Sequence, residues 1–138
     1  MAWNWLIRRL GATGALAGAE DSKARKRRKP PASEQHKEAA LHLKHGRERY
    51  NAKNYSAALE EFRRAVELDT EYALAHYYVG LAAYKLNDSQ SAERAWTRAE
   101  ELGPTSDTGL KARSKLELVK RQATNVVKEL EQRVRGGR

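Results

Sequence analysis

Side chains that could carry out chemistry are few in this chain, and they do not form a catalytic arrangement. None of the 138 residues is cysteine, which excludes thiolate catalysis, disulfides and cysteine-ligated zinc. His42 and His45 share a helix face, but no further ligand stands at a spacing that would complete a metal site. Gly11, Gly14 and Gly18 are not followed by the Gly-Lys-Ser/Thr of a phosphate-binding loop. We therefore expect no catalytic residue, no cofactor and no metal, and a protein that works by binding.

Charge is distributed unevenly along the chain. The 27 lysines and arginines outnumber 18 acidic residues, for a net charge of +9. Residues 39–106 carry a net charge of −1, whereas residues 1–38 and residues 107–138 each carry +5. A basic balance would suit nucleic acid or an anionic membrane surface. Here it belongs to the two ends of the chain and not to its middle.

The first 32 residues combine a short amphipathic segment with a basic linker. In residues 1–10, Trp3, Leu6 and Ile7 fall on one helical face, as in segments that lie in a membrane interface or in a partner's groove. Residues 11–32 are predicted to be a flexible linker, whose basic residues include Arg25, Lys26, Arg27, Arg28 and Lys29. We expect this arm to contact an anionic membrane or another polyanion. Nucleic acid is less favoured, because no aromatic residues interrupt the basic run.

The same residues leave the location of the protein open. Arg8-Arg9 before the weakly apolar residues 10–17 resembles a poor twin-arginine export signal, and the absence of acid before Glu20 suits a transit peptide. The apolar residues ahead of the arginines fit an export signal badly, so a retained interaction segment ranks first. No run approaches the roughly 18 apolar residues of a membrane-spanning helix. We expect a cytoplasmic protein or one peripheral at a membrane, with a targeting signal as the alternative.

Helical periodicity begins at residue 34 and continues almost to the C-terminus. No segment shows the alternation that a strand needs. Turn signals divide the pattern into helices predicted over residues 34–52, 55–68, 71–86, 89–102 and 106–134. The predicted fold class is all-α, with antiparallel helix–turn–helix pairs and a long C-terminal helix.

Residues 39–72 repeat in residues 73–106, at an offset of 34. Identical pairs include Ala39/Ala73, His42/His76, Gly46/Gly80, Tyr50/Tyr84, Ala58/Ala92, Ala65/Ala99 and Leu68/Leu102. Phe62 aligns with Trp96. A helix–turn–helix unit of 34 residues is the tetratricopeptide spacing, and about half of the chain resembles that family. The resemblance implies two repeats within residues 33–106 of a short α-solenoid, with residues 107–138 as a capping helix and basic tail.

The repeated positions predict how each helix pair packs. Gly46 and Gly80 would let the second helix of each pair approach closely, and the paired alanines would form its inner face. Phe62 and Trp96 would fill the remaining space. His42 and His76 depart from the family, which usually has an aromatic residue there, so the first helix is the least certain.

The resemblance implies a concave groove lined by the first helix of each unit. Its predicted residues are Lys44, Arg47, Tyr50, Asn51, Tyr77, Tyr78, Leu81, Tyr84, Lys85, Lys111 and Lys115. Tyrosines beside basic side chains suit an acidic or aromatic-bearing peptide or helix. The alternative is that some of these tyrosines are simply packed between helices. Leu43, Arg47 and Tyr78 occupy places where a carboxylate clamp for chaperone tails needs other residues, so we do not expect that ligand.

The C-terminal helix carries a second predicted contact surface. Apolar residues recur at 4-3-4-3-4 spacing from Ala112 to Leu130, a narrow seam suited to another helix. We predict a helix-association face formed by Leu116, Val119, Val126 and Leu130. The helix is about twice as long as a cap requires, so residues beyond 123 would project and leave Val127 and Val134 uncovered as well. Self-association or docking into a larger assembly would cover them, with fraying as the alternative.

These observations favour a non-catalytic adaptor or assembly subunit. Such a protein would hold a partner peptide or helix in its groove and be tethered by its basic N-terminal arm, its C-terminal helix or both. The alternative is a subunit associated with nucleic acid or a ribonucleoprotein and held there by the basic flanks.

Overall fold

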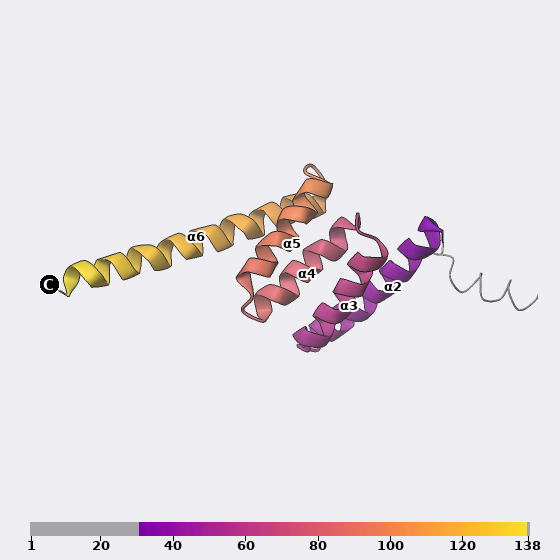
Figure 1. Ribbon diagram of the computed structural model, residues 1–138, viewed down its shortest axis with the longest axis horizontal. Coiled ribbons are helices and arrows are strands. Elements are labelled where there is room, and N and C mark those ends of the chain that lie inside the picture. Colours follow the sequence, from indigo (N-terminus) through magenta and orange to yellow (C-terminus); the bar gives the residue numbers. More distant parts are fainter. Residues whose placement is uncertain (1–30, 138) are drawn as a thin grey trace, which may run out of the picture. The chain divides into compact units, whose positions relative to one another are not determined.

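The computed structural model describes residues 31–137, which contain five α-helices and no strand. Figure 1 shows their order: α2 (Ala32–Asn51), α3 (Tyr55–Leu68), α4 (Ala73–Lys85), α5 (Ser89–Leu102) and α6 (Asp107–Gly136). The all-α class is confirmed, and every predicted helix is present with its ends shifted by at most two residues. None of the helices in this part of the chain is long and apolar enough to cross a membrane. The predicted contacts of Trp3, Leu6, Ile7 and residues 25–29 lie outside the described residues.

The 34-residue period is preserved in the local structure. The helices α3 and α5 begin and end 34 residues apart, and α6 begins 34 residues after α4. Two residues after the first helix of each pair, Lys53 and Asn87 adopt the left-handed conformation, with φ of 61° and 62°. The next residues, Asn54 and Asp88, cap the second helix by accepting hydrogen bonds from backbone amides at 3.4 and 3.1 Å. The two units therefore share the same turn, cap and second helix, although α2 begins earlier in its unit than α4 does.

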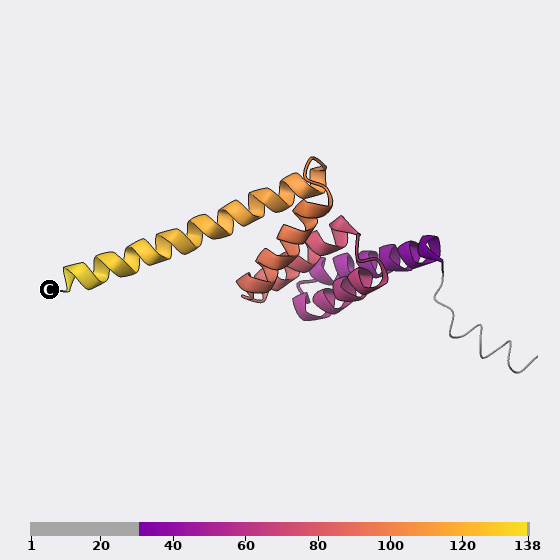
Figure 2. The same ribbon diagram turned by 45° about the horizontal axis from the view of Figure 1, so that its top comes forward.

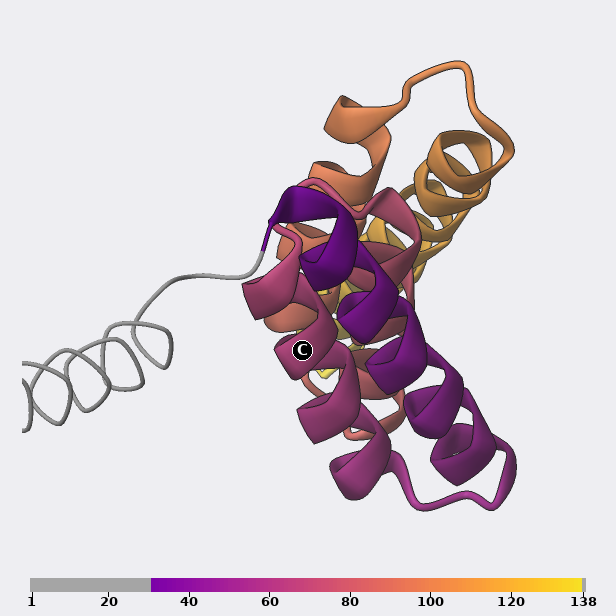
Figure 3. The same cartoon turned by 90° about the vertical axis from the view of Figure 1, so that its right-hand side faces the viewer.

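The helices form two layers. Each helix packs against the next one along the chain, and α4 also contacts α2 and α6. One layer is therefore α2, α4 and α6, and the other is α3 and α5. Figure 2 shows the antiparallel pairs obliquely, and Figure 3 shows α2 and α3 running side by side. This arrangement places the first helices of successive units next to one another, as a groove requires.

Each helix pair is closed by one large ring that packs over a glycine. Phe62 covers Gly46 and Trp96 covers Gly80, so closely that a Cβ atom at either glycine would overlap the ring. Phe62 is 0% exposed and Trp96 is 1% exposed. The aligned alanines Ala58, Ala65, Ala92 and Ala99 are all fully buried. The predicted alternation of small and large residues is therefore the actual packing of the core.

Polar contacts join α2 to α3 where the family pattern is weakest. His42 Nδ1 lies 2.7 Å from Glu61 Oε2, and His36 Nδ1 lies 2.6 Å from Asp69 Oδ2. An ionised carboxylate only accepts hydrogen bonds, so both histidines donate from Nδ1. The hydrogen bond from His42 lowers the pKa of Glu61. His42 thus replaces an apolar contact between the helices with a hydrogen bond to the facing helix.

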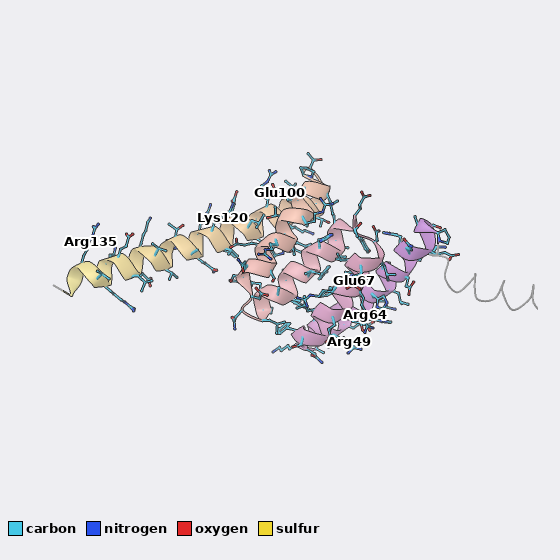
Figure 4. The ribbon with its side chains drawn as sticks, viewed as in Figure 1. Arg49, Arg64, Glu67, Glu100, Lys120 and Arg135 are labelled. Atoms are coloured by element: carbon cyan, nitrogen blue, oxygen red, sulfur yellow. The ribbon has the colours of Figure 1, made fainter. Side chains whose placement is uncertain are left out.

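The last helix starts as a third unit and does not turn. Ser106 caps it by accepting a hydrogen bond from Gly109 N at 3.1 Å, and Arg113 Nε donates to Glu100 of α5 at 2.7 Å. The positions equivalent to Lys53 and Asn87 would fall at Arg121, but the chain there continues as helix for a total of 30 residues. At 1.5 Å per residue, α6 is about 45 Å long. Figure 4 marks Lys120, near the place where α6 leaves α5, and Arg135 on the part with no neighbouring helix.

Candidate functional site

A pocket of about 100 Å³ lies where the ends of α2 and α4 meet the middle of α6. Its lining comprises Tyr50, Leu81, Tyr84, Lys85, Trp96, Lys115, Leu118 and Val119. Five of these are predicted groove residues, contributed by three different helices: Tyr50, Leu81, Tyr84, Lys85 and Lys115. The layer of first helices therefore carries a hollow near the C-terminal ends of α2 and α4.

Aromatic contacts position the tyrosines around this pocket. Tyr50 packs edge-to-face on Tyr55, with ring centroids 5.1 Å apart, and Tyr84 packs on Trp96 at 5.9 Å. The hydroxyl of Tyr84 donates to Gln122 Oε1 at 2.9 Å, so α4 and α6 are joined beside the pocket. The Nζ of Lys85 lies 5.9 Å from the ring centroid of Tyr55. These contacts restrict the side chains before any ligand arrives.

The pocket has an apolar floor and a positive rim. Trp96 and Val119 are buried beneath it, whereas Lys85 is exposed and Lys115 is partly exposed. Burial raises the pKa of Tyr50, so this phenol is neutral at physiological pH. The two ammonium groups are therefore the only charges in the lining. Such a site can take one apolar side chain and place an anionic group beside it.

The other predicted groove residues do not line this pocket. Tyr78 packs on Phe62 at 5.2 Å between ring centroids, and the guanidinium carbon of Arg47 lies 5.5 Å from the centroid of Tyr78. Tyr77 is partly buried, and its carbonyl accepts the indole N–H of Trp96. These two tyrosines therefore support the core as well as the groove face. The polar groove residues away from the pocket are exposed: Lys44, Asn51 and Lys111.

Three pocket residues were absent from the predicted groove: Trp96, Leu118 and Val119, the last of which was predicted for the helix-association face. Leu118 stands 34 residues after Tyr84, which itself stands 34 after Tyr50. The repeat offset, extended once more, identifies Leu118 as the third member of this set. Trp96 was predicted only as a core residue, and the structure shows that it also forms the floor of the pocket.

The predicted helix-association face needs a correction. Leu116 and Val119 are 7% and 6% exposed and pack in the core with Trp96, so neither is available to a second helix lying along the seam. They face α4 and α5 because the first half of α6 closes the open side of the second repeat. Val126 and Leu130 are 55% and 54% exposed. The available part of the seam therefore begins after Val119.

Comparison with protein families finds a match to the TPR repeat over residues 46–87. The matched segment begins at Gly46 in α2, includes α3 and α4, and ends at the turn residue Asn87. The comparison with curated proteins finds no match.

Proposed function

We propose that this chain, whose residues 46–87 match the tetratricopeptide (TPR) repeat, is an adaptor that holds an acidic peptide or helix of another protein in the groove formed by α2, α4 and α6. TPR repeats generally mediate protein–protein interactions. The proposed mechanism is reversible binding without catalysis. The basic N-terminal arm would tether the adaptor to an anionic surface.

The observation that supports this proposal is the pocket between Tyr50, Tyr84 and Lys115. It is open at the surface, its walls are already held by aromatic contacts, and its charges are both positive. Because the side chains around the hollow are already held in place, little conformational entropy is lost when a ligand binds. One apolar side chain of the ligand can therefore act as an anchor. Carboxylates next to that anchor would gain from Lys85 and Lys115. We therefore expect a ligand that combines a single large apolar residue with neighbouring acidic ones.

Peptide selection followed by charge reversal tests this function. Peptides selected from a random library on the wild-type protein should share an apolar residue flanked by Asp or Glu. A labelled peptide from this set should bind the Lys85→Glu, Lys115→Glu double variant at least about 10-fold more weakly, as measured by fluorescence anisotropy.

The matched control reverses two arginines in the other layer. Arg94 and Arg98 lie on the exposed face of α5, so the Arg94→Glu, Arg98→Glu double variant has the same net charge without changing the groove. It should bind the peptide about as tightly as wild type. Equal weakening by both double variants would show that net charge and not the groove determines binding.

A further inference from the structure

The C-terminal part of α6 carries an apolar stripe that nothing in the described chain covers. Every residue from 120 to 137, here called the free segment, is exposed. Val127, Leu130 and Val134 are 53%, 54% and 72% exposed, and with Glu131 and Arg135 they line a shallow hollow. A second apolar surface along the stripe would remove these side chains from water and so stabilise this part of the helix.

The stripe continues the contact face of the first half of α6. At 100° per residue, Ala123, Val127, Leu130 and Val134 lie on the same side of the helix as the buried Ala112, Leu116 and Val119, and the exposed Val126 lies at the edge of that side. Those buried residues pack against α4 and α5. A neighbour on the free segment would thus lie beyond the turn that joins α4 and α5. That turn presents Leu86, which is 40% exposed.

The spacing of the stripe is symmetric about its own centre. Its residues 123, 127, 130 and 134 are separated by 4, 3 and 4, and their midpoint falls between residues 128 and 129. The free segment, residues 120–137, has the same midpoint. A second copy aligned antiparallel over the whole segment would therefore place Ala123 opposite the partner's Val134. It would likewise place Val127 opposite the partner's Leu130, as in the core of a two-helix coiled coil.

The charges beside the stripe favour the antiparallel orientation. In this alignment Lys128 is level with the partner's Glu129, and Glu131 lies within one helical turn of the partner's Lys128. A parallel alignment would instead set each charged residue level with its own copy. Like charges at one level repel, whereas opposite charges steer and orient the pair. An antiparallel pair also keeps the two repeat units apart, at opposite ends of the joined helices.

We propose that residues 120–137 form an antiparallel two-helix interface with the same residues of a second copy, which makes the protein a two-fold symmetric dimer. The interface is isologous, because the same surface contributes on both sides. The dimer carries two grooves that face separate ligands, so a partner with two binding segments would be held more tightly than one with a single segment. This inference does not depend on what the groove binds.

Sedimentation analysis of the full chain over a range of concentrations tests the dimer. The wild type should pass from monomer to dimer as concentration rises. Leu130→Glu should raise the dissociation constant at least about 100-fold, because two apolar contacts are lost in each dimer. Gln132→Glu introduces the same charge on the opposite face of α6 and should leave the constant within about threefold of wild type. A wild type that stays monomeric, or a Leu130→Glu protein that dimerises like wild type, would overturn the proposal.

Folding of the variants is monitored separately. Leu130 makes no contact with the core, so the Leu130→Glu protein should keep its thermal unfolding midpoint when measured at concentrations where the wild type is monomeric. Unchanged unfolding together with lost dimerisation supports the interface.

Single cysteines test the orientation, because the chain has no cysteine of its own. Ala123→Cys and Val134→Cys proteins, mixed and mildly oxidised, should form an intermolecular disulfide. Neither should form one alone, since two copies of the same position would lie about 16 Å apart. Disulfides in the separate proteins and none in the mixture would indicate a parallel pair and overturn the antiparallel arrangement.

Discussion

Trp96 donates its indole Nε1–H to the carbonyl oxygen of Tyr77 at 3.2 Å, and the same ring packs over Gly80 one turn further along α4. A single buried side chain thus joins α5 to α4 by a polar edge and an apolar face. In the first repeat Phe62 covers Gly46 in the same way but has no N–H to donate. The contact between ring and glycine is therefore what the two units share.

This contact makes both glycines sensitive to a single methyl group. Gly80→Ala would place a Cβ atom within the indole of Trp96, and neither the ring nor the α4 backbone can move freely in a closed core. We expect a loss of about 1–3 kcal/mol in the free energy of unfolding, measured by urea denaturation. Gly136→Ala is the control, because nothing lies within 4 Å of a Cβ there. A Gly80→Ala protein as stable as wild type would contradict the packing described.

The hydrogen bond between His42 and Glu61 should make stability depend on pH. In the folded protein this hydrogen bond lowers the pKa of the Glu61 carboxyl below its ordinary value of 4.5. The folded state therefore favours the ionised carboxylate. The stabilisation is present at neutral pH and disappears as the pH falls through the lowered pKa. Glu61→Gln should cost about 1 kcal/mol at pH 7, because a charge-assisted hydrogen bond becomes a neutral one.

Urea denaturation at two pH values checks this prediction. The difference between wild type and Glu61→Gln should shrink at acid pH, as the wild-type carboxyl becomes protonated below its lowered pKa. Glu101→Gln serves as control, since that side chain is 58% exposed and pairs only with Arg98 three residues earlier. A difference that stays constant with pH would argue against a role for the ionised form of Glu61.

The two halves of α6 should differ in what they contribute to folding. Leu116 is buried in the core, so Leu116→Ala should destabilise the protein by about 2–5 kcal/mol. Removal of residues 123–138 deletes no buried residue described by the structure and should change the stability by less than about 1 kcal/mol. Both are measured by urea denaturation at concentrations where the full chain is monomeric. A large loss on truncation would mean that the free segment supports the core.

The basic arm should account for binding to polyanions. Deletion of residues 1–32 should abolish binding to vesicles that contain anionic lipid, whereas neutral vesicles should bind neither form. Binding of the full chain should fall steeply between low and physiological salt, because each neutralised charge releases a counterion. Vesicle sedimentation measures both effects.

A duplex of DNA, tested in the same way, distinguishes the alternative. Tighter binding to the duplex than to anionic vesicles at matched salt would favour the nucleic-acid-associated subunit. If deletion of residues 1–32 left the affinity for anionic vesicles and for the DNA duplex unchanged, the arm would have no role in binding polyanions.

Much of the fold was predictable from the repeated pattern. Helix ends follow from local turn chemistry. Each turn and cap occurs twice at an offset of 34, with Lys53 equivalent to Asn87 and Asn54 equivalent to Asp88. The pairing of Gly46 with Phe62 was equally predictable, because a small residue on one helix must face a large one on the next. The groove was harder, since Tyr78 and Tyr84 each pack on a large ring but only Tyr84 lines the pocket.

The sequence alone determined the all-α class, the two repeats, the neutral middle of the chain and the glycine–aromatic contacts, because these depend on residue types at short or repeated spacings. Only the tertiary structure decided how one continuous seam along α6 is divided. Leu116 and Leu130 belong to the same pattern, but α4 and α5 extend only far enough to cover the first. Helical periodicity specifies which side of a helix is apolar, whereas the length of its neighbours determines how much of that side is buried.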